Sequence, residues 1–515
     1  MKILKNIFIV LGILFVIFIG VIFYVANPRN SFVNQTIDFG NPLFIPKELQ
    51  PRIENGEKVF DVTIQKGQTE FFSGKRAATL GFNNNYLGDT LRAHTGDKIR
   101  INVKNTLGEE TTVHWHGMHV PAAMDGGPHQ VIEPNTTWQP YWTIKNQAST
   151  LWYHPHLMGK TGEQVYKGLA GLFIIDNTTS DALNLPKQYG IDDIPLIVQD
   201  RLFDSRGQLL YNHQHKQSID SGMLGDTILV NGTVAPYINV PAKLVRLRIV
   251  NASNARRYNF GFSDSRVFYQ IATDGGFLTA PVRRTKMILS PGERAEVLVD
   301  FSADQHPVTL MSLPVVDDIN PIQKAIFNIL VKPSDQHQQF NILEIRPQQG
   351  HYTNQTIPQK LTNISFLKAS TAVKTRQITL DSQKINDKKM DLSRVDEIIK
   401  KGDTEIWSVK NKSPIYHPFH MHDIQFQILD RNGVKPAAYE QGWKDTVMIE
   451  PSETVRLIMQ FNDYADPTLP YMFHCHLLEH EDMGMMAQFV VVDTLSEKIK
   501  LQSPPKSGNH EMQMQ

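Results

Sequence analysis

Histidines are concentrated in four short segments of the chain, and each segment contains the pattern His-x-His. Imidazole nitrogens are common ligands of zinc, copper and iron, so paired histidines are candidate metal ligands. On a strand, residues i and i+2 point to the same face, and each pair can therefore present two rings to one place. Ten of the 19 histidines lie in these segments: His114 and His116; His154 and His156; His417, His420 and His422; and His474, His476 and His480.

The single cysteine of the chain, Cys475, lies between two of these histidines. One cysteine can form no intramolecular disulfide and cannot hold an iron–sulfur cluster. An isolated cysteine is often only a small buried apolar residue. Here His480 and Met485 follow it closely and His417 precedes it. A thiolate with two imidazoles and a weak methionine ligand is the donor set of a blue-copper electron-transfer site.

Zinc is the alternative metal for a group of cysteine and histidine ligands. A tetrahedral zinc site takes about four ligands, fewer than this chain offers, and the sequence contains no Cys-x-x-Cys pair. The ligand types therefore favour several copper ions. If Cys475 binds one and its neighbours bind others, only a few bonds separate the sites. Such wiring suits the delivery of single electrons to a centre that reduces dioxygen to water.

An internal repeat puts two of the histidine pairs in equivalent positions. Residues 96–105 resemble residues 402–411: in both, Gly-Asp leads into an alternating strand that ends at Asn. The first histidine of a pair, His114 or His420, follows nine positions after that Asn. A weaker relative at 244–251 is followed by no histidine, so the middle repeat is expected to be a spacer without metal.

The elements that must position these residues are predicted to be β-strands. Short β-branched and aromatic runs, broken by Gly, Pro, Asn and Asp, are typical of β-sandwiches rather than βαβ units. One short helix is indicated at 391–401. We predict three related β-sandwich domains at 35–180, 190–335 and 370–495, a polar linker at 336–369 and a C-terminal tail at 496–515. If the first and third domains face each other, their histidine pairs share one boundary.

Residues 1–30 differ from the rest of the chain. Lys2 and Lys5 precede an apolar run at 7–26, about long enough to cross a membrane as a helix. No good small-x-small cleavage site follows the run. We therefore predict an N-terminal transmembrane signal anchor that leaves the remainder on the extracytoplasmic face of the membrane. The alternative is a cleaved signal peptide and a secreted or periplasmic protein.

The overall charge argues against one class of partner. Lys+Arg and Asp+Glu both number 52, so the formal net charge is zero. Such a chain has no global field to attract nucleic acid, and we expect no nucleic-acid partner. We expect a monomer.

After the anchor, nearly the whole sequence resembles the multicopper oxidase family, and within it the bacterial copper-efflux oxidases and their cell-division relatives. The resemblance implies an all-β fold of three cupredoxin-like Greek-key β-sandwich domains. It also implies four copper ions, of which one is type 1, one is type 2 and two are type 3. The motifs that carry it are His114–Gly117, Asp125–Pro128, His154–His156, Gly442–Val447 and His474–Met486.

The resemblance assigns each copper ligand residue by residue, and all twelve positions match. The cell-division relatives have lost copper ligands, whereas this chain keeps all of them. A role as a non-catalytic envelope scaffold is therefore disfavoured. The assigned ligands are His417, Cys475, His480 and Met485 for type 1; His114 and His420 for type 2; and His116, His154 and His476 with His156, His422 and His474 for the type 3 pair.

Two acidic residues are implied to relay the protons consumed when water forms, Asp125 and Glu481. Their alternative roles are those of an ordinary turn carboxylate and a surface carboxylate.

The resemblance implies a laccase-like oxidase that uses dioxygen as electron acceptor and a small reducing substrate, such as a phenol, as donor. A cuprous or other metal-ion donor, in copper tolerance, is the alternative. Copper-efflux relatives carry a methionine-rich insertion in the third domain, whereas residues 367–415 of this chain contain a single methionine, Met390. Ser413 and Ile415 also stand where those relatives place Asp and Met ligands. Both departures favour the phenolic donor.

Overall fold

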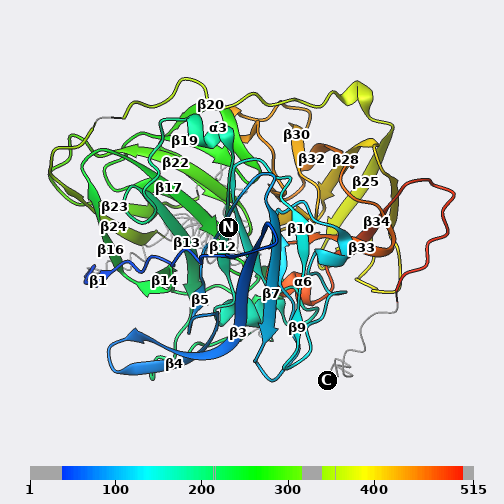
Figure 1. Ribbon diagram of the computed structural model, residues 1–515, viewed down its shortest axis with the longest axis horizontal. Coiled ribbons are helices and arrows are strands. Elements are labelled where there is room, and N and C mark those ends of the chain that lie inside the picture. Colours follow the sequence, from blue (N-terminus) through cyan, green and yellow to red (C-terminus); the bar gives the residue numbers. More distant parts are fainter. Residues whose placement is uncertain (1–37, 213, 215, 316–338, 354, 503–515) are drawn as a thin grey trace, which may run out of the picture.

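The computed structural model describes residues 38–212, 214, 216–315, 339–353 and 355–502. The described chain is mostly β-sheet, which confirms the all-β prediction. Six sheets form three β-sandwiches in chain order. Figure 1 shows the first in blue and cyan at the centre, the second in green on the left, and the third in yellow to red on the right.

The first sandwich packs a seven-stranded sheet against a four-stranded one. Alternation explains its strands: in Lys98–Asn105 every second residue is buried, beginning with Ile99. The larger sheet contains β2 (Arg52–Glu54), β3 (Glu57–Phe72), β4 (Lys75–Phe82), β5 (Leu87–Gly88), β7 (Lys98–Asn105), β9 (Thr137–Trp138) and β10 (Tyr141–Thr143). The smaller contains β6 (Leu91–His94), β8 (His114–His116), β11 (Ser149–His154) and β12 (Gly171–Asp176).

The second sandwich extends into the segment that we predicted to be a linker. Residues 340–348 form a strand that pairs with two others of this sandwich and buries Ile342, Leu343 and Ile345. The prediction was wrong there because this short apolar run lies within a polar, Gln-rich stretch. One sheet contains β1 (Asn41–Pro42), β16 (Pro236–Pro241), β18 (Tyr258–Phe262), β21 (Lys286–Leu289), β23 (Val308–Ser312) and β24 (Phe340–Gln348). The other contains β13 (Asp193–Arg201), β14 (Thr227–Val230), β15 (Thr233–Val234), β17 (Leu244–Asn251), β19 (Phe268–Thr273), β20 (Gly276–Arg284) and β22 (Arg294–Asp300).

The third sandwich consists of two five-stranded sheets. The short helix indicated at 391–401 is wrong, because residues 397–400 pair in parallel with the last strand, and sheet pairing overrides a weak local helical pattern. One sheet contains β25 (Lys374–Asp381), β26 (Lys384–Ile385), β28 (Thr404–Asn411), β30 (Phe426–Arg431) and β32 (Thr454–Gln460). The other contains β27 (Glu397–Lys400), β29 (His417–Met421), β31 (Thr446–Ile449), β33 (Asp466–Cys475) and β34 (Met486–Val492).

The sequence repeat corresponds to one strand that recurs in every sandwich, namely β7, β17 and β28. Each ends at an asparagine, Asn105, Asn251 or Asn411. The amide nitrogen of each donates to two backbone carbonyls. One of the two belongs to the residue two positions before a proline, which is Ile132, Leu289 or Ile449. Its amide oxygen accepts from the backbone N–H two residues later. The asparagine therefore fixes the start of the loop that carries the histidines in the first and third sandwiches.

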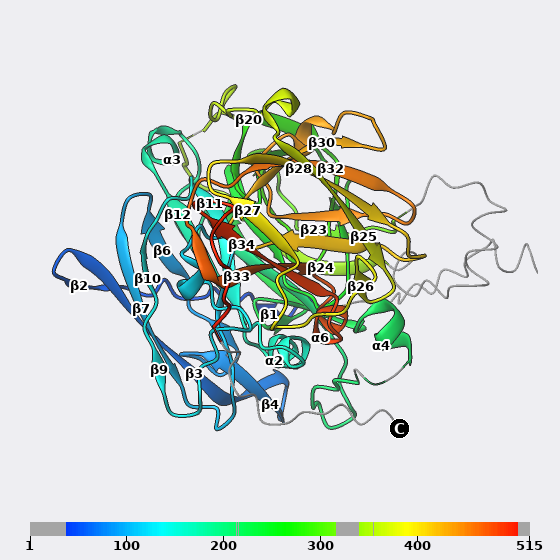
Figure 2. The ribbon, with the colours of Figure 1, turned by 90° about the vertical axis from the view of Figure 1, so that its right-hand side faces the viewer.

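Short helices from different domains contact one another. Figure 2 shows α6 (Leu478–Asp482) of the third sandwich close to α2 (Thr161–Tyr166) and α4 (Lys216–Ser221). The remaining helices in the described part of the chain are α3 (Thr178–Ala182) and the 3-10 turns η1 (Ala122–Met124), η2 (Ala369–Thr371) and η3 (Ala438–Glu440).

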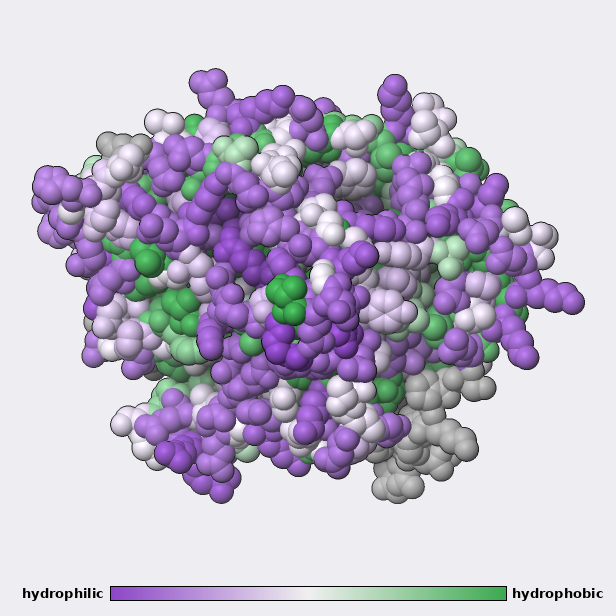
Figure 3. Space-filling model, in the orientation of Figure 1, coloured by the Kyte–Doolittle hydropathy of each residue, from purple (hydrophilic) through white to green (hydrophobic). Residues whose placement is uncertain are grey.

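Within the described residues, no helix has the length and apolar character needed to span a membrane. The anchor predicted at residues 1–30 lies outside the described part of the chain. The face of the molecule in Figure 3 is largely hydrophilic, with apolar side chains scattered over it.

Candidate metal centre

In the third sandwich, strand alternation directs the cysteine to one face of a sheet and the neighbouring histidine to the other face. In β33, Phe473 and Cys475 point into the core of that sandwich. His474 therefore points to the other face, toward the first sandwich. In β29, Phe419 and Met421 likewise enter the core, which leaves His420 facing outward. A contiguous His-Cys-His thus supplies two different sites.

The first and third sandwiches present their histidines in the same way. In the first, His114 on β8 is directly opposite His154 on β11. In the third, His420 on β29 is directly opposite His474 on β33. These and the four other imidazoles of the predicted pairs meet at the boundary between the two sandwiches, and each residue is at most 1% exposed.

Ring nitrogens of the eight histidines gather into groups whose ligand atoms lie within 4.8 Å of one another. Two groups are the same sets of three that the family resemblance assigned to the type 3 coppers. A third contains the two residues assigned to type 2. The groups are His116, His154 and His476; His156, His422 and His474; and His114, His420 and His422.

The orientation of the rings fits a bound cation. His474 Nδ1 donates to the carbonyl of Cys475 at 3.0 Å, and His422 Nδ1 donates to a carboxylate at 2.7 Å. Because these oxygens only accept, the proton sits on Nδ1 and Nε2 keeps its lone pair. The Nε2 atoms of His156, His422 and His474 lie only 3.1–3.2 Å apart. Facing lone pairs repel each other, and a metal ion between them would remove that repulsion.

Unpartnered nitrogens lead to the same conclusion. His114 Nδ1 donates to the carbonyl of Asp125 at 2.9 Å, and His420 Nδ1 donates to that of Asp445 at 2.8 Å. The Nε2 atoms of both rings are buried and have no hydrogen-bond partner among the described residues, and the same is true of both ring nitrogens of His476. Buried polar atoms are rarely left unpaired in native proteins, so these atoms suit metal ligation.

For seven of the cluster's imidazoles, burial favours the neutral form, which is the form that binds metal. Desolvation is the main cause in every case, and charge on neighbouring imidazoles generally adds to it. It lowers the pKa of His422 to about 4 and that of His476 to about 3. The pKa values of the following rings lie well below 6.5: His116, His154, His156, His420 and His474.

A second cluster surrounds the cysteine. Cys475 Sγ lies 3.3 Å from His417 Nδ1 and 3.9 Å from His480 Nδ1, and all three residues are buried. Met485 is fully buried, and its backbone is hydrogen-bonded to Cys475 and His480. Burial raises the pKa of the Cys475 thiol above its ordinary value. A thiolate therefore needs a cation beside it.

The two predicted acidic residues both contact the histidine cluster, and neither is on the surface. Asp125 Oδ2 accepts from His422 Nδ1 at 2.7 Å. Glu481 Oε1 lies 3.1 Å from His156 Nδ1, and its Oε2 lies 3.3 Å from His474 Nδ1. Burial raises the pKa of Glu481 well above its usual value. Burial also favours the neutral form of Asp125, but His422 and His114 outweigh it and lower the pKa of Asp125.

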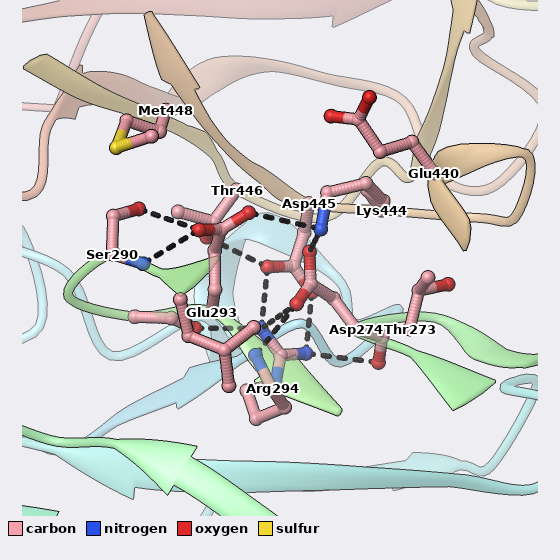
Figure 4. Close-up of polar contacts among 12 residues, drawn as sticks. Thr273, Asp274, Ser290, Glu293, Arg294, Glu440, Lys444, Asp445, Thr446 and Met448 are labelled. Carbon is pink, nitrogen blue, oxygen red and sulfur yellow. Dashed lines mark hydrogen bonds and ion pairs between the residues drawn. The ribbon is translucent and has the colours of Figure 1, made fainter. Parts of the chain in front are cut away.

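Sequence reasoning missed two residues at this site, Asp445 and Arg294. Asp445 Oδ1 lies 3.0 Å from His116 Nε2, and the Arg294 guanidinium holds both oxygens of the same carboxylate at 2.6 Å. Figure 4 shows this pair among the charged groups between the second and third sandwiches. The only available signal was that Asp445 lies in the Gly442–Val447 motif, since a buried pair between domains leaves no local pattern.

Comparisons with known proteins agree with this geometry. Three family models, each described as multicopper oxidase, match residues 63–180, 184–331 and 354–494. The chain is 36% identical over 460 residues to multicopper oxidase mco of Staphylococcus aureus, which covers 88% of this chain and 92% of that protein. It is also 35% identical over 454 residues to cell division protein FtsP of Escherichia coli, covering 87% and 92%.

A solved structure of another protein resembles this chain over the whole length of that protein. It is a laccase-like multicopper oxidase from a lignin-degrading Ochrobactrum, described as having oxidase activity towards lignin model compounds and lignosulfonate. The TM-score is 0.79 at 35% identity, and the match covers 88% of this chain and 100% of that one.

Proposed function

Because the chain belongs to the multicopper oxidase family, we propose that it is a laccase-like oxidase that takes single electrons from small phenolic donors and passes them to dioxygen. Four one-electron oxidations supply the electrons that, with four protons, convert one dioxygen into two waters. One observation carries the proposal. Cys475 clusters with His417 and His480, eight other histidines form groups of three, and the contiguous residues His474, Cys475 and His476 join the two clusters.

We propose the ligand sets as the resemblance assigns them. Copper supplies one-electron redox chemistry beside the thiolate and dioxygen reduction at the histidine cluster when bound. The proposed holders are His417, Cys475, His480 and Met485 for type 1; His114 and His420 for type 2; and His116, His154 and His476 with His156, His422 and His474 for the type 3 pair.

The chain itself provides the link between the clusters. Cys475 faces the core of the third sandwich, and one peptide bond joins it to each flanking histidine. The ring of His474 enters one group of three and the ring of His476 enters the other. Two short covalent routes therefore leave the sulfur, one toward each member of the proposed pair.

Asp125 and Glu481 are proposed to handle protons, on the strength of their positions. Each carboxylate lies within 3.5 Å of the Nδ1 atoms of two histidines in the cluster. A carboxylate there can orient the ring and hold a proton beside the centre where protons are consumed.

The surroundings of His417 favour an organic donor over a metal ion. Ser413 Oγ lies 2.8 Å from His417 Nε2, and Ile415 packs against the core of the third sandwich. Neither side chain offers the sulfur or carboxylate that would hold a cuprous ion. Met390 packs with Met472 and Met486 in a separate apolar cluster. With the predicted anchor at 1–30, we propose that the enzyme acts on the extracytoplasmic face of the membrane.

Oxygen uptake by the copper-loaded full chain tests the proposal. We expect about four copper ions per chain, an intense blue absorption, and faster oxygen uptake with a phenol such as 2,6-dimethoxyphenol than with Cu(I). Oxygen uptake with Cu(I) but not with a phenol would contradict the proposal and would indicate a metal-ion oxidase. Copper-loaded protein that consumes oxygen with neither donor would instead support a scaffold role, as the similarity to FtsP allows.

A further inference from the structure

We infer that Arg294, from the middle domain that holds no predicted ligand, is a positioning residue for the histidine cluster and acts through Asp445 on His116. The inference rests on the proposed function, because it assumes that this cluster holds metal. The middle domain would then be part of the metal centre and more than the spacer expected from its lack of histidines.

The guanidinium of Arg294 is held by all three domains. Its Nε donates to the carbonyl of Thr150 in the first domain at 3.1 Å. Nη1 donates to the carbonyl of Gly292 at 3.0 Å, and Nη2 donates to that of Asp274 at 3.1 Å, both in the second domain. The two remaining N–H groups donate to the carboxylate of Asp445 in the third domain, as Figure 4 shows. All five donors of a side chain with no exposed surface are used, so the fork has one orientation.

Asp445 transmits this position to two rings. Its carboxylate contacts His116 Nε2 at 3.0 Å, and its backbone carbonyl accepts from His420 Nδ1 at 2.8 Å. Because the carboxylate only accepts, His116 carries its proton on Nε2 and turns the Nδ1 lone pair inward, 3.4 Å from His154 Nε2. The other tautomer of His116, with its proton on Nδ1, would direct an N–H into the group and block a metal ion.

Asp125 and Asp445 are counterparts in the two metal-holding domains. The carbonyl of each accepts from the first histidine of the His-x-His pair in its own domain, His114 or His420. The carboxylate of each contacts the second histidine of the other domain, His422 or His116. Of these two aspartates, only Asp445 forms an ion pair with an arginine, and that arginine, Arg294, comes from the second domain.

Two glycines allow the backbone to approach this pair closely. Gly117 has φ +84°, and a Cβ there would lie 2.4 Å from Asp445 Oδ2 and 2.6 Å from Arg294 Nη2. Gly292 has φ +85°, and its Cβ would lie 3.0 Å from the His476 ring. The turn that leads into Arg294 therefore packs directly on the cluster.

A neighbouring ion pair offers a matched control. Lys444 Nζ lies 2.8 Å from Asp274 and 3.1 Å from Glu293, so it joins the same two domains. Its Nζ forms no ion pair with the Asp445 carboxylate and no hydrogen bond with His116. If Arg294 served only to hold the domains together, loss of either cation would have the same effect on metal binding.

The test compares Arg294→Lys with Lys444→Met in the full, copper-reconstituted chain. Lysine keeps the charge but cannot form the planar fork. We expect Arg294→Lys to keep the blue absorption of the cysteine site and to lower copper affinity at the histidine cluster by about 10–100-fold. Because the coupled pair is then lost, a larger fraction of the copper should be detectable by electron paramagnetic resonance. Lys444→Met should retain the wild-type copper content and spectrum.

Wild-type spectra from Arg294→Lys, or equal copper loss in both variants, would overturn the inference. If Arg294→Lys does not fold, as judged by loss of the blue band, Asp445→Asn carries the same test. The proposed function is judged separately, by oxygen uptake of the wild type with a phenol. A chain that binds copper in the expected pattern but consumes no oxygen would therefore refute the function and still support the role of Arg294.

Discussion

Asp125 in the first domain accepts a hydrogen bond from His422 in the third domain at 2.7 Å. The contact crosses the boundary at which the histidine cluster lies, and it sets which nitrogen of His422 faces the cluster. We expect Asp125→Ala to free that ring and to lower oxygen uptake by about 10–100-fold, the usual cost of losing a partner of a metal ligand. Asp125→Asn, which keeps an acceptor oxygen, should lose less. Steady-state oxygen consumption gives the ratio, and the blue band should be unchanged in both.

Replacement of the thiol separates the two clusters. Cys475→Ser removes the only thiolate ligand of its site, so we expect loss of the blue absorption and of about one copper ion per chain. Oxygen uptake with a phenol should cease, while copper at the histidine cluster should remain. Absorption and metal analysis of the same sample measure both effects. A variant that stayed blue would show that Cys475 is not the thiolate ligand.

Glu481 can be tested with an isosteric change. Glu481→Gln preserves volume but cannot hold and release a proton, and we expect oxygen uptake to fall by about 10²–10⁴-fold at unchanged copper content. Glu479→Gln is the control. Glu479 is also buried in α6, but it accepts hydrogen bonds from Met223 N and Asn254. Equal losses in the two variants would indicate disruption of α6 instead of a proton role.

Gly117 lets us separate steric contact from backbone strain. Gly117→Ala places Cβ against Asp445 and Arg294, whereas Gly56 has nearly the same φ, +82°, with nothing within 4 Å of its Cβ position. Gly56→Ala should cost about 1–2 kcal/mol of unfolding free energy from backbone strain alone. Gly117→Ala should cost more, because a buried ion pair must move, and should also reduce copper loading. Denaturant unfolding measures the difference, and equal costs would contradict the packing described above.

The pH dependence of stability should include a contribution from Glu296. Burial favours its neutral form, but Arg246 and Arg248 outweigh this and hold the pKa of Glu296 below its ordinary 4.5. The folded chain therefore binds this proton less tightly than the unfolded chain. The resulting stabilisation is present above about pH 4.5 and is lost as the pH falls through the lower, folded pKa.

Glu296→Gln should remove that contribution. We expect a loss of about 3–5 kcal/mol at neutral pH, since it leaves two buried arginines short of a partner, and a shallower decline in stability below pH 4.5. Glu70→Gln, at an exposed ion pair 4.0 Å from Arg76, should change stability by less than about 1 kcal/mol. Urea unfolding across pH 3–7 measures both, and parallel curves for wild type and Glu296→Gln would contradict the prediction.

The sequence alone determined the residue types of the site and their grouping. A strand has a period of two, so His-x-His pairs share a face and Cys475 must point away from His474 and His476. The repeat around Asn105 and Asn411 then makes the pairs equivalent. These inferences succeed because they depend on local geometry and on the similarity of two domains.

Only the tertiary structure decided how the rings are oriented and what holds them. Arg294 and Asp445 are 151 positions apart, and they meet because the second and third sandwiches pack together beside the first. Ring orientation depends on the acceptor that each Nδ1 or Nε2 meets, and for His422 and His116 that acceptor is a carboxylate from another domain, Asp125 or Asp445. No local period encodes a contact between domains, because it arises from the packing of complete sandwiches whose surfaces form only after each has folded.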